Sequence, residues 1–170
     1  MDYQDFTIEI RSAGANLFEA TVIEAPRRAK ARSVFPEPLS RGELELLSSD
    51  KTGASSSPSQ PREVGTRLYA ALFQTEIDRL FQSCRDSLQH GDQGLRLRLR
   101  IGADDLQAEY LSQLPWEWLW DPWQKAFLSV DLSTPVVRDF AVGIGNNPLL
   151  AEPPLRILVV DSSPVTESFL

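Results

Sequence analysis

The stretch Leu95-Arg96-Leu97-Arg98-Leu99-Arg100-Ile101 decides the fold of this chain. Apolar and basic side chains alternate along it without a break, and successive side chains of a β-strand point to opposite faces. The stretch therefore predicts a strand with one apolar face against a core and one basic face. We interpret the arginine row 96/98/100 as a solvated sheet face, or one covered by acidic side chains, in preference to a binding surface for an anionic partner.

Two amphipathic helices are predicted on the N-terminal side of this strand. Their apolar residues recur at three- and four-residue spacing, which places them on one face of each helix. These residues are Val64, Leu68, Ala71 and Leu72 in the first helix and Ile77, Leu80, Phe81, Cys84 and Leu88 in the second. Thr75 is the expected N-cap of the second helix. A shorter helix is predicted over about 40–49, because Ser40 and Glu43 have the spacing of a capping box.

Further upstream, the pattern predicts an N-terminal β-hairpin. Residues 3–11 and 17–24 alternate between apolar and polar side chains, and a turn cluster over 12–16 separates them. Two polar segments are interpreted as surface loops. One is the basic stretch Arg27, Arg28, Lys30 and Arg32, which we interpret as a solvated loop in preference to a binding patch. The other is 50–63, which has no large apolar side chain to offset its ordering entropy and is predicted to be flexible.

Downstream of the arginine-rich strand, a helix is predicted from about 104 and is interrupted at Pro115. Residues 127–130 and 136–140 are predicted as a strand pair joined through 131–135, and 141–154 as a loop. The unbroken apolar run Leu155–Val160, ending at Asp161, predicts a strand buried on both faces. The expected fold class is α/β leaning to α+β, with an N-terminal hairpin, helices, a central mixed sheet and a final buried parallel strand.

This last strand also bears on domain organisation. A strand that is apolar on both faces is usually covered by crossover helices, and only nine residues follow Asp161. We therefore expect residues 1–154 to be the N-terminal part of a larger module, and 155–170 to hold the first strand of a truncated α/β unit.

Composition excludes several classes of function. The net charge of −7 argues against a nucleic-acid partner, since phosphate binding normally requires a basic excess. The N-terminus is a poor signal peptide, and no stretch approaches the roughly 20 apolar residues of a membrane helix. One cysteine allows no intramolecular disulfide, which fits a reducing compartment and a cytoplasmic location. With one histidine, no metal site is predicted, and no cofactor is expected.

Several single residues are candidates for chemistry or recognition. Cys84 completes an apolar helical stripe, so packing is preferred to catalysis. His90 lies at a helix end, where a capping or surface role is preferred to general-base catalysis. Asp161 ends a strand, a position that often borders the ligand crevice of α/β sheets. The run 157–164 also resembles the opening of response-regulator receivers, and a receiver-like start is kept as a third alternative.

The segment 116–123 is dense in tryptophan. Trp116, Leu119 and Trp120 would share one face of a helix, whereas Trp118 and Trp123 need separate sites. Core packing is preferred to a recognition surface, although exposed tryptophan is typical of binding hot spots. Glu117 is expected to pair with an arginine, either Arg138 or one from the row 96/98/100, in a structural role.

The order of these segments resembles the start of CHAT-domain proteins, which are caspase-like peptidases. The resemblance rests on the helix start Gly65-x-x-Leu68-Tyr69-x-Ala71-Leu72-Phe73, on Leu114-Pro115-Trp116-Glu117-x-Leu119 followed by Phe127-Leu128, on Thr134-Pro135-x-Val137-Arg138, and on Pro153–Val160. It spans nearly the whole chain, and these motifs occur in order.

The resemblance implies a Cys–His dyad peptidase of the caspase and separase clan. The family's histidine and cysteine motifs do not occur in this chain, so none of its functional residues can be assigned here. The expected function is a non-catalytic N-terminal portion that scaffolds the peptidase domain, with protein partners or a C-terminal peptidase half. The alternative is a stand-alone interaction module that uses the tryptophan cluster or a sheet edge.

Overall fold

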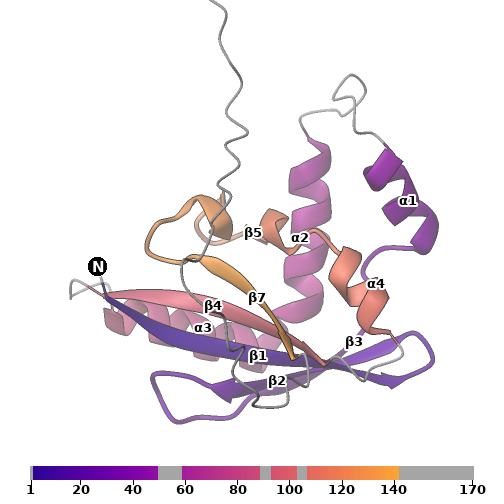
Figure 1. Ribbon diagram of the computed structural model, residues 1–170. Helices are drawn as coiled ribbons and strands as arrows, with labels where there is room; N and C mark the ends of the chain where they lie inside the picture. Colours follow the sequence, from indigo (N-terminus) through magenta and orange to yellow (C-terminus); the bar gives the residue numbers. More distant parts are fainter. Residues whose placement is uncertain (1, 50–58, 89–92, 103–106, 142–170) are drawn as a thin grey trace, which may run out of the picture.

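The computed structural model describes residues 2–49, 59–88, 93–102 and 107–141 (Figure 1). They form an α/β fold whose main sheet has five strands in the order β3-β2-β1-β4-β7. The main elements are β1 (Asp2–Gly14), β2 (Leu17–Glu24), β3 (Arg32–Pro36), α1 (Arg41–Ser49), α2 (Gln60–Leu72), α3 (Thr75–Leu88), β4 (Gln93–Gly102), α4 (Ala108–Gln113) and β7 (Val136–Ala141). The predicted fold class, mixed sheet and N-terminal hairpin are confirmed.

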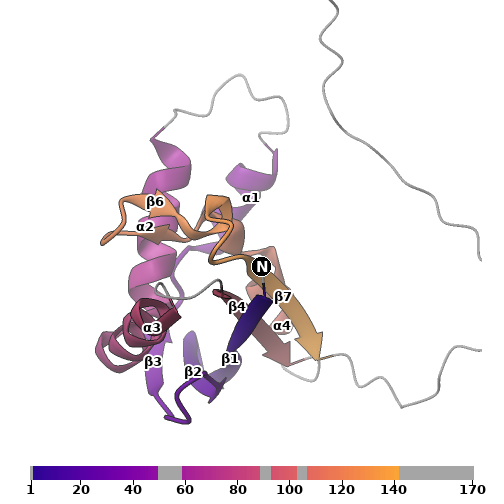
Figure 2. The same cartoon turned by 90° about the vertical axis from the view of Figure 1, so that its left-hand side faces the viewer.

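The sheet is mixed in strand direction. β2 runs antiparallel to both β1 and β3, whereas β1, β4 and β7 are parallel to one another. The arginine-rich strand β4 therefore lies between two parallel neighbours. Its alternating side chains give this central part of the sheet one apolar face and one basic face. In Figure 2, β7 lies at the opposite side of the sheet from β3 and α3.

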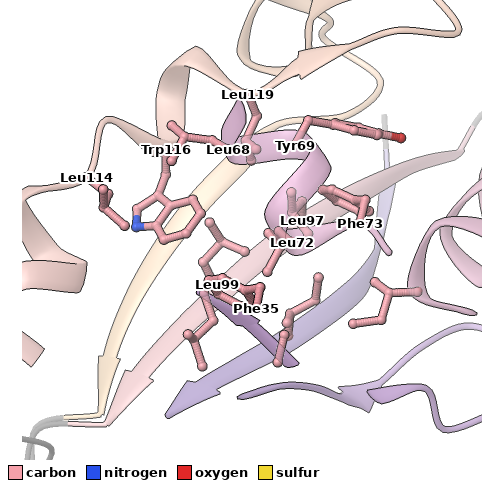
Figure 3. Close-up of a cluster of buried hydrophobic side chains, with 14 of the residues drawn as sticks. Phe35, Leu68, Tyr69, Leu72, Phe73, Leu97, Leu99, Leu114, Trp116 and Leu119 are labelled. Carbon is pink, nitrogen blue, oxygen red and sulfur yellow. The ribbon is translucent and has the colours of Figure 1, made fainter. Parts of the chain in front are cut away.

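One face of the sheet carries the core. Alternate residues of β1 and β4 are fully buried, and Phe6 contacts Phe81 of α3 edge-on at 5.2 Å between ring centroids. Phe18 of β2 stacks on Tyr110 of α4 at 5.5 Å. Figure 3 shows side chains of α2, β3, β4 and the 114–119 segment in one cluster. The helices thus cover the same face, as expected for a sheet that is apolar on one side.

The opposite face is charged, and its cations are paired. Asp5 of β1 accepts hydrogen bonds from Arg96 at 2.6 Å and Arg98 at 3.2 Å. Asp139 of β7 accepts from Arg98 at 2.9 Å and Arg100 at 3.3 Å. The hydrogen bond from Arg96 lowers the pKa of Asp5. The arginine row is therefore covered by carboxylates of the two neighbouring strands, as one of the two sequence interpretations proposed.

Three predictions about local structure differ from the structure, two of them only at one end. Residues 60–63 form the first turn of α2, because Pro61 is tolerated in a first helical turn, so the loop is shorter than predicted. The basic stretch is an exposed loop at Arg27, Arg28 and Lys30, as predicted, but Arg32 opens β3, which pairs with β2. The predicted strand pair 127–130 and 136–140 does not form. Instead Ala126–Phe127 (β6) pairs with Trp120–Asp121 (β5), Leu128–Val130 (η2) is a 3-10 turn, and β7 pairs with β4.

Helix α1 begins with the predicted capping box. The Glu43 carboxylate accepts from the Ser40 backbone N–H at 2.7 Å, and the Glu43 N–H donates to the Ser40 hydroxyl at 3.3 Å. Arg67 of α2 adds a hydrogen bond to Glu43 at 2.6 Å and another to the Pro38 carbonyl at 2.7 Å. The hydrogen bond from Arg67, followed by those from Ser40, lowers the pKa of Glu43 to about 2.

We expect Arg67→Met to raise the pKa of Glu43 toward its ordinary value near 4.5, because the largest cause of the shift is removed. Since the folded-state pKa lies below the unfolded one, ionised Glu43 stabilises the fold above about pH 4.5, and this stabilisation is lost as the pH falls toward 2. The measurement is the NMR titration of the Glu43 carboxyl carbon. Arg62→Met, on the same helix, is the matched control, because Arg62 stacks on Trp120 instead. Equal titration of Glu43 in both variants would contradict the assignment.

Candidate functional site

The outer edge of β7 is the first component of the candidate site. β7 pairs with β4 in the register Leu97↔Val136 and Leu99↔Arg138, and the Leu97 N–H donates to the Pro135 carbonyl at 2.9 Å. Backbone groups of successive strand residues point to opposite sides in the plane of the sheet. Val136 and Arg138 therefore direct their N–H and C=O groups away from β4. In the part of the chain that the structure describes, no strand lies on that side of β7.

Arg138 joins this edge to the tryptophan segment. Its Nε donates to Glu117 Oε1 at 2.7 Å, its Nη2 pairs with the other carboxylate oxygen, and its Nη1 donates to the Ser112 carbonyl at 2.7 Å. A fork-to-fork pair of this kind fixes orientation as well as charge. The structure thus brings Glu117 and Arg138 together, as one of the sequence alternatives proposed, while the row 96/98/100 pairs elsewhere. The result is that β7 is held against the turn Trp116–Trp118 (η1) and the end of α4.

The loop that leads into β7 is also fixed. The Asp131 carboxylate accepts from the Ser133 N–H at 2.8 Å and from the Ser133 hydroxyl at 2.7 Å, and Thr134 is fully buried. The Ser133 carbonyl accepts from the Leu95 N–H at 2.8 Å, so the loop already joins the ladder with β4. The Tyr3 hydroxyl donates to the Leu132 carbonyl at 2.9 Å. The motif Thr134–Arg138 therefore serves to dock an edge strand in register.

The four tryptophans lie in different environments. Trp116 is fully buried, and its indole N–H donates to the Leu111 carbonyl at 2.8 Å. Trp120 is half-buried between the Phe127 ring, edge-on at 4.9 Å, and the Arg62 guanidinium at 4.7 Å. Trp118 is half-buried beside α2, where its carbonyl approaches Gly65. Trp123 is 70% exposed, and its indole N–H donates to Asp78 at 3.3 Å.

The expected helical face shared by Trp116, Leu119 and Trp120 is not formed. The helix α4 ends at Gln113, before Pro115, and the chain continues as the single 3-10 turn η1 and then the strand β5. Trp116 and Leu119 still reach the core, but Trp120 pairs with Phe127 across a two-stranded hairpin. Helical spacing fails here because Pro115 lacks the N–H that a continuing helix would need.

A buried ion pair between Arg85 and Asp121 was missed by sequence analysis. Arg85 Nη1 donates to Asp121 Oδ2 at 2.5 Å, and the exposed fractions of the two side chains are 7% and 0%. The other Asp121 oxygen accepts from the N–H of Trp123 at 2.8 Å and of Gln124 at 3.3 Å. Arg85 Nε has no hydrogen-bond partner among the described residues. The pair joins α3 to the β5–β6 hairpin and fixes the turn that presents Trp123.

A polar network continues from this pair to the surface. Gln82 accepts a hydrogen bond from Arg85 and donates to the Tyr69 hydroxyl at 3.1 Å, and Tyr69 donates to Asp78 at 2.7 Å. Burial is the main cause that raises the pKa of Tyr69 far above its ordinary value. Tyr69 is thus a neutral hydrogen-bond donor at physiological pH. The network positions Trp123 through Asp78.

The remaining sequence candidates are Cys84, His90 and Asp161. Cys84 is fully buried in α3. His90 and Asp161, with the strand predicted at 155–161 and its receiver-like alternative, lie outside the described residues. Within the described ranges no three His, Cys, Asp or Glu side chains are grouped as metal ligands would be. None of the helices described there is long and apolar enough to cross a membrane.

Comparison of the chain with protein-family models, with curated proteins and with solved structures returned no match. A fixed strand with paired side chains on one face can accept a further strand on its outer side, where none of the described strands lies.

Proposed function

We propose that this chain is the sheet-forming, non-catalytic N-terminal portion of a caspase-like peptidase module of the CHAT type. The observation that carries the proposal is the parallel series β1-β4-β7, which ends in the docked edge strand β7. A peptidase domain would continue this sheet by adding a parallel strand to β7. The apolar stretch 155–161, which follows β7 in sequence, is the candidate for that strand.

The motifs that carry the resemblance support this role, because they contact one another. Gly65 of α2 lies under the Trp118 carbonyl of η1, and Glu117 of η1 is paired with Arg138 of β7. Three motifs that are far apart in sequence therefore build one framework behind the edge strand. The arrangement is structural in character: it contains packing, backbone contacts and one ion pair.

The burial of Cys84 also favours a scaffold role for this chain. A nucleophilic thiol must reach the substrate and have a base beside it, whereas Cys84 is fully buried in the apolar stripe of α3. It is the only cysteine of the sequence. A peptidase module that includes this chain would have to take its catalytic thiol from another part of the protein.

Proline substitutions at the two sheet edges test the proposal. Val136→Pro removes an N–H that points away from β4, so the described fold should persist while addition of a strand is blocked. In the protein encoded by the whole reading frame, we expect this variant to lose about 100-fold in cysteine-peptidase activity. A loss of about this size is typical when catalytic groups are displaced by about 1 Å. The assay is cleavage of peptide substrates, with urea unfolding to verify that the fold is retained.

The matched control is Val34→Pro on β3, at the other edge of the sheet. The Val34 carbonyl turns outward to accept from Gln74 at 3.0 Å, so its N–H also points away from β2. This variant should keep full peptidase activity. Equal activity of both variants would contradict the role of the β7 edge. A reading frame that supplies no Cys–His dyad would contradict the assignment to a peptidase module.

A second candidate, a protein-interaction module, is favoured by Trp123. This side chain is 70% exposed yet held by Asp78, and a rigid exposed indole is typical of binding hot spots. Under this alternative, Trp123→Ala would abolish capture of a partner, whereas Val136→Pro would leave it unchanged. Under the scaffold proposal, Val136→Pro lowers peptidase activity and Trp123→Ala has the smaller effect on it.

A further inference from the structure

A groove lies between the β2–β3 connection, residues 25–31, and one face of α3. Its volume is about 450 Å³, and three of its lining side chains are cationic: Arg27, Lys30 and Arg79. Arg27 and Lys30 belong to the basic stretch, which the sequence pattern indicates to be a solvated loop. Arg79 comes from the helix, so only the fold brings the three together. We call this site the basic groove.

The cationic side chains of the basic groove are not paired with carboxylates of the described residues. Among the described residues, the arginines of β4 and β7 and Arg85 of α3 all have carboxylate partners. By contrast, Arg27, Lys30 and Arg79 form no ion pair with any described residue. Glu76 is the one carboxylate among the described residues that line the groove, so the described lining has a net positive charge in a chain whose net charge is −7. A locally positive groove of this kind attracts an anionic ligand.

The length and floor of the groove indicate the kind of anion. Glu76, Arg79, Leu80 and Ser83 line it from positions i, i+3, i+4 and i+7 of α3, which share one face. Seven residues of helix span about 10 Å, the length of about three residues of extended peptide. Leu80 is half-buried and Ala31 is buried, so the floor is apolar between the cationic side chains. A bare phosphate would use neither the length nor the apolar floor.

We propose that the basic groove binds an extended acidic peptide segment of a partner protein, with an apolar side chain on Leu80 and flanking carboxylates on Arg27, Lys30 and Arg79. This proposal does not rest on the peptidase assignment. A docking site on α3 lies on the β3 side of the molecule, away from the β7 edge (Figure 2). Partner recognition and extension of the sheet can therefore take place on the same chain.

The test is fluorescence anisotropy with a labelled, end-capped peptide Glu-Asp-Leu-Asp-Glu at low ionic strength. We expect saturable binding that weakens with added salt. Arg79→Glu and Lys30→Glu should each weaken binding by about tenfold or more, because each replaces an attraction by a repulsion. Exchange of the central leucine for serine should also weaken binding, since the apolar floor then has no partner.

The matched control is Lys125→Glu, which makes the same charge change on the exposed β5–β6 turn. It should alter affinity by less than about twofold if the groove is specific. Equal weakening by Lys125→Glu, or equal binding of the neutral peptide Gln-Asn-Leu-Asn-Gln, would overturn the proposal. Inorganic phosphate or phosphatidylserine vesicles that occupy the groove while the acidic peptide does not would also overturn it, and would identify a phosphate or a membrane as the ligand.

Discussion

Replacement of Gly65 by alanine is expected to lower the free energy of unfolding by about 3 kcal/mol or more, at the upper end of the usual cost of overpacking. A Cβ at this position would lie 1.7 Å from the Trp118 carbonyl oxygen and 2.8 Å from its carbonyl carbon. These are backbone atoms, so no side-chain rotation can relieve the overlap. Helix α2 and the turn η1 would have to separate. Urea unfolding monitored by tryptophan fluorescence measures the loss.

Gly42→Ala is the control for this prediction. Gly42 also lies in a helix, α1, but a Cβ there would meet no atom within 4 Å beyond its chain neighbours and the backbone of its own helix. Alanine is favoured over glycine inside a helix by up to about 1 kcal/mol, so this variant should be as stable as the wild type or more stable. A similar loss in the two variants would show that helix propensity, and not the contact with Trp118, decides the effect.

The second large effect is expected at the buried ion pair. Asp121→Asn keeps the size of the side chain and an oxygen for the Trp123 and Gln124 N–H groups, but it leaves the Arg85 charge buried without a counter-ion. Breaking one side of a buried pair typically costs about 3–5 kcal/mol. We expect Asp121→Asn to fall in that range by urea unfolding. Because the hairpin is held by this pair, the fluorescence of Trp123 should change before global unfolding.

The double variant Arg85→Met/Asp121→Asn separates two explanations of this loss. If the cost arises from an uncompensated buried charge, removal of the arginine should recover most of the stability. If the double variant is as unstable as Asp121→Asn, the attraction between the two groups would be the larger effect. Glu43→Gln serves as the exposed comparison. Its partner Arg67 is 44% exposed, so the loss there should be at most about 1 kcal/mol.

Local patterns predicted most of the fold. The strict alternation of β4, the apolar stripes of α2 and α3 and the Ser40–Glu43 capping box each depend on neighbours in sequence, and each forms as expected. The strand partners could not be predicted in the same way. β7 pairs with β4, although the turn before β7 suggested a hairpin with residues 127–130. Parallel pairing joins distant segments, so no local turn signal marks it.

The candidate site was predicted only in part. The pairing of Glu117 with Arg138 was among the alternatives, because a carboxylate among aromatic side chains needs a cation. The pair of Arg85 and Asp121 was missed. Arg85 follows Cys84 on α3, just beside its apolar stripe, and only the return of the β5–β6 hairpin over α3 buries it. The basic groove was missed for the same reason, since Arg79 joins Arg27 and Lys30 through tertiary structure.

Addition of a further strand to β7 can be detected by backbone hydrogen exchange. The measurement is made on the protein encoded by the whole reading frame, residue by residue along β7. The N–H groups of Val137 and Asp139 face β4 and should exchange slowly in any case. If a strand is added to β7, the N–H groups of Val136 and Arg138, which face outward, should exchange as slowly as these two. Exchange of Val136 and Arg138 at the rate of free amides, beside protected neighbours, would contradict the addition of a strand.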